Sequence, residues 1–158
     1  MRKMTSRGEE VYSTDVFEIL FDYEITRVKR NPAPMALLHI EITSTASNEE
    51  TAQAAPTVFV TALNTHLRSV DIPSTAGRDF RVLLPSTDEP GARTVCERLL
   101  SVFKNSFATP NGSVAFTLQI GIVACAAGVE LSMSDISQRA KDAVKQSRLK
   151  GPNTFVVV

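Results

Sequence analysis

The sequence lacks the features that mark several common classes of protein. Its 17 basic and 17 acidic side chains cancel, so it carries no electrostatic footprint for duplex nucleic acid or an anionic membrane. No apolar run approaches the ~18 residues that span a bilayer, and the opening MRKMTSRGEE has no apolar signal-peptide core. We therefore expect a cytoplasmic protein that binds neither nucleic acid nor membrane. A small phosphate-bearing ligand stays compatible with this composition.

Cysteine is also scarce. Cys96 and Cys125 lie far apart in apolar contexts, with no Cys-x-x-Cys or Cys/His spacing. This pattern predicts buried reduced thiols, and it argues against a disulfide framework or a zinc site.

The 158 residues suit one domain with a single core. We expect a flexible N-terminal segment over residues 1–12 and one folded domain over residues 13–158. The first helix is predicted to be capped at Asp15, with Glu18 three residues on, and to end before Pro32. Residues 35–43 (MALLHIEIT) begin as a continuous apolar run and end in alternation, which predicts a strand that reaches an exposed end.

The rest of the chain continues this pattern. A helix is predicted from Pro56, with Phe59, Leu63, Leu67 and Val70 on one face. An edge strand with Pro73 and the run FRVLL (residues 80–84) form a predicted hairpin. The later elements are a helix opened by Thr87, Asp88 and Pro90, a turn at Asn111-Gly112, a strand through residues 116–122, a helix capped by Ser134 or Asp135, and a final strand TFVVV. The fold class is therefore α+β, with a single mixed β-sheet covered by helices.

Several stretches, in this order and spacing, resemble the GGDEF or diguanylate cyclase family over residues 17–158. They are FEILFDYEITRVKRNPAPMALLHIEI (residues 17–42), RSVD (68–71), AGRDFRVLLP (76–85), FTLQIGI (116–122), and AKDA (140–143) followed by Arg148 and GPN (151–153). The resemblance implies a nucleotidyl cyclase or ferredoxin-like palm. The alternative is an unrelated ferredoxin-like α+β domain with chance matches.

The family joins two GTP molecules into cyclic di-GMP and needs carboxylates that hold two divalent cations. Its first metal-binding aspartate corresponds to Glu41, and its second to Thr43. In the signature, Gly77 and Phe80 are kept, the first glycine is Ala76, and the fourth position is Asp79. The third position, an acid in active members, is Arg78, whose charge opposes a cation by roughly 4 kcal/mol per unit charge at about 4 Å.

Other nucleotide-binding elements of the family are missing. Residues 44–55 read STASNEETAQAA where the resemblance places the groups that approach the triphosphate and guanine. Arg148 replaces the family's phosphate-binding lysine, and Pro152 replaces the arginine that follows it. We therefore expect no catalytic residues, no metal and no cofactor. For Glu41 two interpretations stay open, a residual metal ligand or a solvated carboxylate paired with Arg78 across the neighbouring strand.

Arg68 and Asp71 match the R-x-x-D site through which many members of the family bind cyclic di-GMP. Arginine can form a fork on phosphate or guanine, and aspartate can accept from guanine donors. Four residues separate this motif from the signature, where the family usually has five. This shortening could rotate Asp71 away from Arg68. The sequence thus favours a non-catalytic cyclic di-GMP sensor. The alternatives are an end-of-helix arginine beside a turn aspartate in a ligand-free scaffold for a protein partner or self-association, and, least favoured, a working cyclase.

Overall fold

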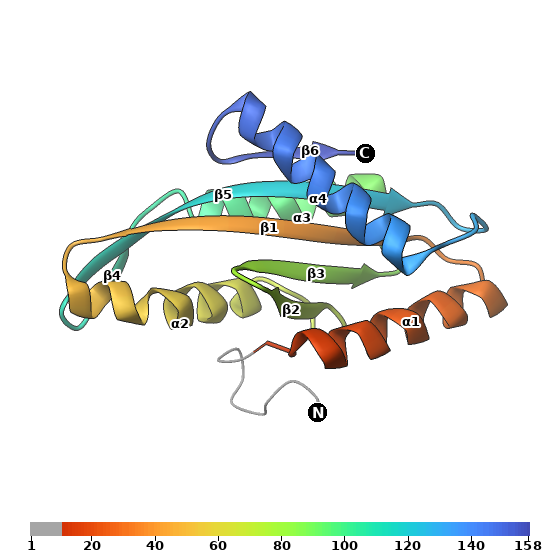
Figure 1. Ribbon diagram of the computed structural model, residues 1–158, viewed down its shortest axis with the longest axis horizontal. Coiled ribbons are helices and arrows are strands. Elements are labelled where there is room, and N and C mark those ends of the chain that lie inside the picture. Colours follow the sequence, from red (N-terminus) through yellow and green to blue (C-terminus); the bar gives the residue numbers. More distant parts are fainter. Residues whose placement is uncertain (1–10) are drawn as a thin grey trace.

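A computed structural model describes residues 11–158, so most of the predicted flexible segment over residues 1–12 lies outside the described residues. The chain forms a six-stranded sheet in the order β2-β3-β1-β5-β4, with β6 beside β5 (Figure 1). The elements are α1 (Thr14–Arg30), β1 (Met35–Ala46), α2 (Glu49–Thr65), β2 (Ile72–Ala76), β3 (Asp79–Pro85), α3 (Glu89–Val102), β4 (Phe107–Thr109), β5 (Gly112–Cys125), α4 (Met133–Lys150) and β6 (Thr154–Val157). The β5–β6 pair is parallel and the other strand pairs are antiparallel. The predicted α+β class with one mixed sheet is confirmed.

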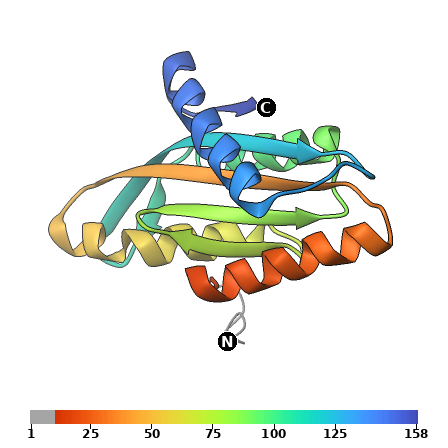
Figure 2. The ribbon, with the colours of Figure 1, turned by 45° about the vertical axis from the view of Figure 1, so that its right-hand side comes forward.

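Alternation along β1 divides the core between the two faces of the sheet. Ala36, Leu38 and Ile40 pack with the residues of α2 and α3, whereas Met35 and Leu37 pack with α1 and α4. The views show the same division, because α4 crosses β1 and β5 on one face while α3 lies behind β5 on the other (Figures 1 and 2). The α1/α4 face therefore also receives the polar residues that continue this alternation, which begin at His39.

Helix α4 packs directly on the backbone of β5. A Cβ atom on Gly121 would lie 2.2 Å from the carbonyl oxygen of Ala140 and 2.7 Å from both Cβ of Ala143 and N of Val144. These contacts are far closer than real side-chain contacts, so only glycine allows the helix this position. Gly121 thus sets the height of α4 above the sheet.

The N-caps of α1 and α4 lie two or three residues earlier than the sequence predicts. Ser13 caps α1 and Ser132 caps α4, because the hydroxyl of each accepts the backbone N–H three residues ahead. The predicted caps at Asp15 and at Ser134 or Asp135 are wrong, since these residues lie inside the first turns. Acidic side chains are also favourable there, beside the positive end of the helix dipole, and sequence alone does not separate the two placements.

The second helix and the first strand are both longer than predicted at their shared end. Asn48 caps α2 by accepting the N–H of Thr51, so Pro56 lies inside the helix and does not open it. An interior proline costs about 3 kcal/mol, which here is offset by the cap and by burial of the helix face. Because α2 ends at Thr65, Leu67 and Val70 lie beyond it, and Val70 is exposed. The short strand β4 was not predicted.

The chain is tied to the sheet edge before α1 begins. Tyr12 N donates to Pro73 O at 3.0 Å, Thr75 N donates to Tyr12 O at 3.3 Å, and the Thr14 hydroxyl donates to Thr75 O at 3.0 Å. Pro73 lies in β2 at the edge of the sheet, as predicted. The domain boundary at residue 13 stays a prediction, although Tyr12 already contacts the sheet.

Two further predictions concern the cysteines and membrane-spanning helices. Cys96 and Cys125 are buried free thiols, as predicted, and burial raises the pKa of both. No helix described between residues 11 and 158 has the length and apolarity to cross a bilayer.

Candidate functional site

The stretch of residues 76–80, which resembles the GGDEF signature, lies at the tip of the β2–β3 hairpin. Ala76 and Asp79 are paired where β2 ends and β3 begins, and Gly77 has a positive φ of 65° that favours glycine. Arg78 is exposed at this tip. Phe80 turns to the opposite face and packs in the core, with its ring 4.8 Å from that of Phe59. The signature positions therefore do not act as one group: Asp79 faces α4, whereas Phe80 is structural.

Glu41 and Arg148 form an ion pair across 107 residues of sequence. Arg148 Nε donates to Oε1 of Glu41 at 2.7 Å, and Arg148 Nη2 donates to the second carboxylate oxygen. The hydrogen bond from Arg148 holds the pKa of Glu41 below its ordinary value. Glu41 therefore pairs with Arg148 of α4, and the suggested pairing with Arg78 is wrong. The residue at the metal position and the residue at the phosphate position of the resemblance bind each other.

His39 and Asp79 form a second polar pair next to the first. His39 Nε2 lies 2.8 Å from Oδ2 of Asp79, and the imidazole is almost completely buried. Asp79 also acts electrostatically on Arg148. A small cavity of about 210 Å³ between β1, β3 and α4 is lined by these groups together with Lys141. The lining carries one carboxylate, that of Asp79, and three cations, Lys141, Lys145 and Arg148, so positive charge is in excess there.

The chain after Glu41 offers no free loop. β1 runs on to Ala46 and stays in register with β5, from Glu41 opposite Gln119 to Ala46 opposite Val114. Ser47 then exchanges hydrogen bonds with Ser113, before Asn48 opens α2. The backbone N–H groups of residues 42–46 thus lie in a strand, where the resemblance places elements that approach the triphosphate.

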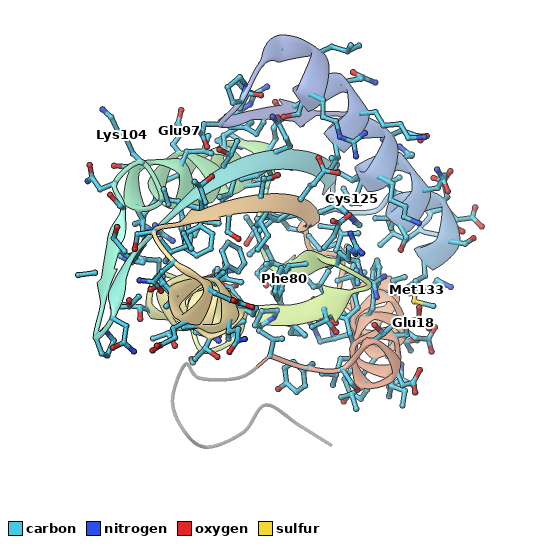
Figure 3. All side chains as sticks on the ribbon, turned by 60° about the vertical axis from the view of Figure 1, so that its left-hand side comes forward. Glu18, Phe80, Glu97, Lys104, Cys125 and Met133 are labelled. Carbon is cyan, nitrogen blue, oxygen red and sulfur yellow. The ribbon has the colours of Figure 1, made fainter. Side chains whose placement is uncertain are left out.

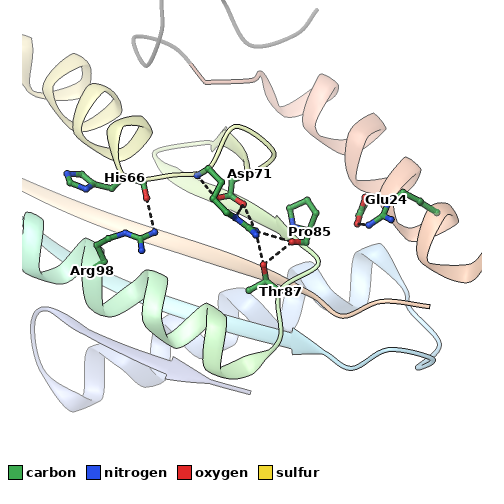
Figure 4. Close-up of polar contacts among 8 residues, drawn as sticks. Glu24, His66, Asp71, Pro85, Thr87 and Arg98 are labelled. Atoms are coloured by element: carbon green, nitrogen blue, oxygen red, sulfur yellow. Dashed lines mark hydrogen bonds and ion pairs between the residues drawn. The ribbon is translucent and has the colours of Figure 1, made fainter. Parts of the chain in front are cut away.

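Arg68 and Asp71 meet at the other end of β3 (Figure 4). Asp71 Oδ1 accepts from Nε of Arg68 at 3.1 Å and from Nη2 at 2.8 Å, while Oδ2 accepts from the Arg68 backbone N at 2.7 Å. Arg68 Nη2 also donates to Pro85 O and to the Thr87 hydroxyl. The shortened arm therefore does not separate the pair.

The two members of this pair differ in exposure. The Asp71 side chain is 0% exposed and the Arg68 side chain is 47% exposed. Asp71 consequently holds Arg68 in one orientation and presents no free oxygen to solvent. Arg98 of α3 lies nearby and donates to His66 O at the end of α2, at 2.9 Å (Figure 4). Two arginines thus flank the end of α2.

Sequence reasoning missed His39, Arg81 and Arg98. His39 stands two residues before Glu41 in an alternating strand, so the period of two already placed both on one face. Arg81 is the polar letter inside the apolar run FRVLL, and it lies opposite His39 in the β1–β3 register. Arg98 had no such signal, because a charged residue on an exposed helix face is ordinary.

We expect the Glu41–Arg148 pair to be visible in a pH titration. Since Arg148 lowers the pKa of Glu41, the pair stabilises the fold above the ordinary glutamate pKa of about 4.3 and loses this contribution as pH falls through the lower folded value. In Arg148→Met the Glu41 pKa should rise, as followed by NMR of its carboxyl carbon. Arg139→Met, which breaks an exposed pair with Asp135 on the same helix, should leave the Glu41 titration unchanged. An equal titration in wild type and Arg148→Met would contradict the ion pair.

Solved GGDEF domains share this arrangement. The GGDEF domain of YfiN (TpbB) from Pseudomonas aeruginosa matches with a TM-score of 0.80 and 15% identity, over 94% of this chain and 91% of that one. Diguanylate cyclase SiaD of the same organism, solved with its activator SiaC, matches with a TM-score of 0.79 and 17% identity over 94% of this chain, which spans 59% of the SiaD chain. DgcB of Caulobacter crescentus, solved with cyclic di-GMP, matches with a TM-score of 0.76 and 12% identity, over 95% of this chain and 83% of that one.

Sequence comparison alone does not reach these proteins. No family model matches the chain, and no curated protein matches it. The similarity is therefore one of fold, and the chain has the fold of GGDEF domains.

Proposed function

We propose that this domain is a non-catalytic signalling module with the GGDEF fold, which binds cyclic di-GMP through the exposed side of Arg68. The absence of catalysis is supported above all by the Glu41–Arg148 ion pair. A carboxylate that already accepts two charged hydrogen bonds is a poor ligand for Mg²⁺, since the cation would have to displace a fixed positive charge. Arg78, also cationic, stands at the other metal-binding position.

Binding of cyclic di-GMP is supported by the fixed orientation of the Arg68 guanidinium. Its guanidinium is held by Asp71, Pro85 O and Thr87, yet half of its side chain faces solvent. An arginine that is fixed before binding loses little side-chain entropy when it meets a phosphate or a guanine edge. In this proposal Arg68 contacts the ligand and Asp71 positions Arg68. Arg98 provides a second cation for a ligand that carries two phosphates.

A second candidate function is a ligand-free scaffold for a protein partner. The observation that favours it is the burial of Asp71, because an acceptor with no exposed oxygen cannot read guanine N–H donors. SiaD, which shares this fold, is seen with an activator protein. In this case the Arg68–Asp71 pair only fastens the end of α2 to β3.

Calorimetry with cyclic di-GMP separates the two candidates. We expect wild type to bind at tens of micromolar or below, and the double variant Arg68→Met/Asp71→Leu to lose binding while remaining folded, since both partners of the buried pair are replaced together. Arg93→Met, an exposed arginine on α3, serves as the control that keeps affinity. Absence of binding by wild type, or equal binding by the double variant, would exclude the ligand role and leave the scaffold.

Catalysis is tested separately with GTP and Mg²⁺. We expect no cyclic di-GMP above the level of a protein-free blank, with an active diguanylate cyclase as the positive control and chromatographic detection of product. Synthesis of cyclic di-GMP by the purified domain would overturn the non-catalytic assignment, whatever the result of the calorimetry.

A further inference from the structure

A larger pocket opens between α1, the tip of the β2–β3 hairpin and the beginning of α4. Its volume is about 550 Å³, which lies in the range of sites for small molecules. Glu18 of α1 and Met133 at the start of α4, both labelled in Figure 3, belong to its lining. The pocket is at the tip of the hairpin, whereas Arg68 contacts Pro85 at the far end of β3. It is therefore separate from the proposed cyclic di-GMP surface.

The floor of this pocket carries a buried arginine without an acceptor. Arg81 is only 7% exposed, and its Nε finds no hydrogen-bond acceptor among residues 11–158. Its guanidinium lies 4.4 Å from the centre of the Phe17 ring, and burial lowers its pKa. A cation–π contact compensates a buried charge only in part, and buried arginine is normally paired with an anion. The Nε donor of Arg81 is thus unpaired beside the pocket, and Glu18 is the acid that acts on its charge.

The remaining walls add positive potential. Lys141 and Arg81 are the cations of the lining and Glu18 is its acid, so two positive charges face one negative charge. Ser134 and Ser137 also line the pocket at the first turn of α4, an 18-residue helix. The first N–H groups of a helix have no acceptor within it and favour anions. The same pocket is thus lined by the guanidinium of Arg81, the ammonium group of Lys141, the hydroxyls of Ser134 and Ser137 and the N-terminus of α4.

We propose that this pocket binds a small phosphate-bearing molecule, with its phosphate on Arg81 and the first turn of α4. A phosphate group offers three acceptor oxygens, which suits donors that approach from the sheet and from the helix at once. His39 lines the same pocket, and its Nδ1 is buried without a partner among the described residues. This site is separate from the Arg68 surface.

The proposal is tested by NMR titration with inorganic phosphate, glycerol 3-phosphate and glycerol. We expect both phosphates, but not glycerol, to shift the backbone amides of residues 133–137, with tighter binding of the ester. Arg81→Met should weaken this binding at least roughly tenfold, because a charge-assisted donor is lost. The variant should unfold at the same or a higher temperature than wild type, since an apolar side chain replaces a buried charge whose Nε has no hydrogen-bond acceptor.

Two controls fix the position of the site. Arg93→Met, on the opposite face of the sheet, and Arg68→Met/Asp71→Leu, at the far end of β3, should both keep wild-type affinity for glycerol 3-phosphate. Failure of both phosphates to bind, equal affinity in Arg81→Met, or loss of binding only in the Arg68 variant would each overturn the proposal. The cyclic di-GMP calorimetry is unaffected by these outcomes, so the two sites succeed or fail separately.

Discussion

Arg68→Ala is expected to lower the free energy of unfolding by about 3–5 kcal/mol. The substitution removes the guanidinium and leaves the carboxylate of Asp71 fully buried, with the backbone N–H of Arg68 as its remaining donor. Domains of this size have a total stability of about 5–15 kcal/mol. The loss should therefore be evident as a fall in the urea midpoint and of roughly 10 °C in melting temperature.

The reverse substitution should cost less. In Asp71→Ala the remaining Arg68 side chain is half exposed and can be solvated, so we expect a loss of about 2–3 kcal/mol, mainly from its charged hydrogen bonds. The double variant Arg68→Met/Asp71→Leu should be close to wild type, because neither charge is left unpaired. The same urea titrations measure the stability of both single variants and of the double variant. If Arg68→Ala lowers the free energy of unfolding less than Asp71→Ala does, burial of the Asp71 carboxylate does not dominate the energetics of this pair.

Gly121→Ala should destabilise the fold by about 3 kcal/mol, since the new methyl group meets the backbone of α4. Backbone atoms cannot swing aside as a side-chain end does, so the whole helix must rise from the sheet. Arg148 is carried on this helix, so its ion pair with Glu41 should weaken. We expect the Glu41 pKa to rise in this variant even though neither partner of the ion pair is altered.

Ala115→Ser is the matched control for this substitution, because it adds one heavy atom at an exposed position of the same strand. Its stability should stay within about 0.5 kcal/mol of wild type. Urea unfolding and the Glu41 titration are measured on both variants. A Gly121→Ala protein with wild-type stability and an unchanged Glu41 pKa would show that α4 does not depend on this close approach.

The elements themselves could be predicted from the sequence where hydrophobic period and turn chemistry agreed. The hairpin around Gly77, the Asp88 cap of α3 and the end of α1 at Asn31 follow from residues that act locally. The errors came where two local signals competed. Pro56 is a good first-turn residue, but Asn48 offered a side-chain cap about two turns of helix earlier, and tertiary burial of the helix decided between them.

The partners of charged residues could not be predicted in the same way. Glu41 faces the same side of the sheet as its strand period implies, but the choice of Arg148 over Arg78 depends on where α4 lies, which is set by Gly121 and the residues above it. Arg68 and Asp71 meet because of the path between α2 and β2, not because of their spacing. Such contacts are properties of packing, and no pattern of letters over a few residues encodes them.

The attachment of Tyr12 to β2 has a consequence for association between molecules. An edge strand with free N–H and C=O groups invites a strand from another chain. Here Pro73 has no N–H to offer, while its carbonyl and the N–H of Thr75 are already bonded to Tyr12. A strand of a second molecule could pair with this edge only after Tyr12 had detached from β2. The segment at Tyr12, just before α1, thus blocks pairing of β2 with a strand of another molecule.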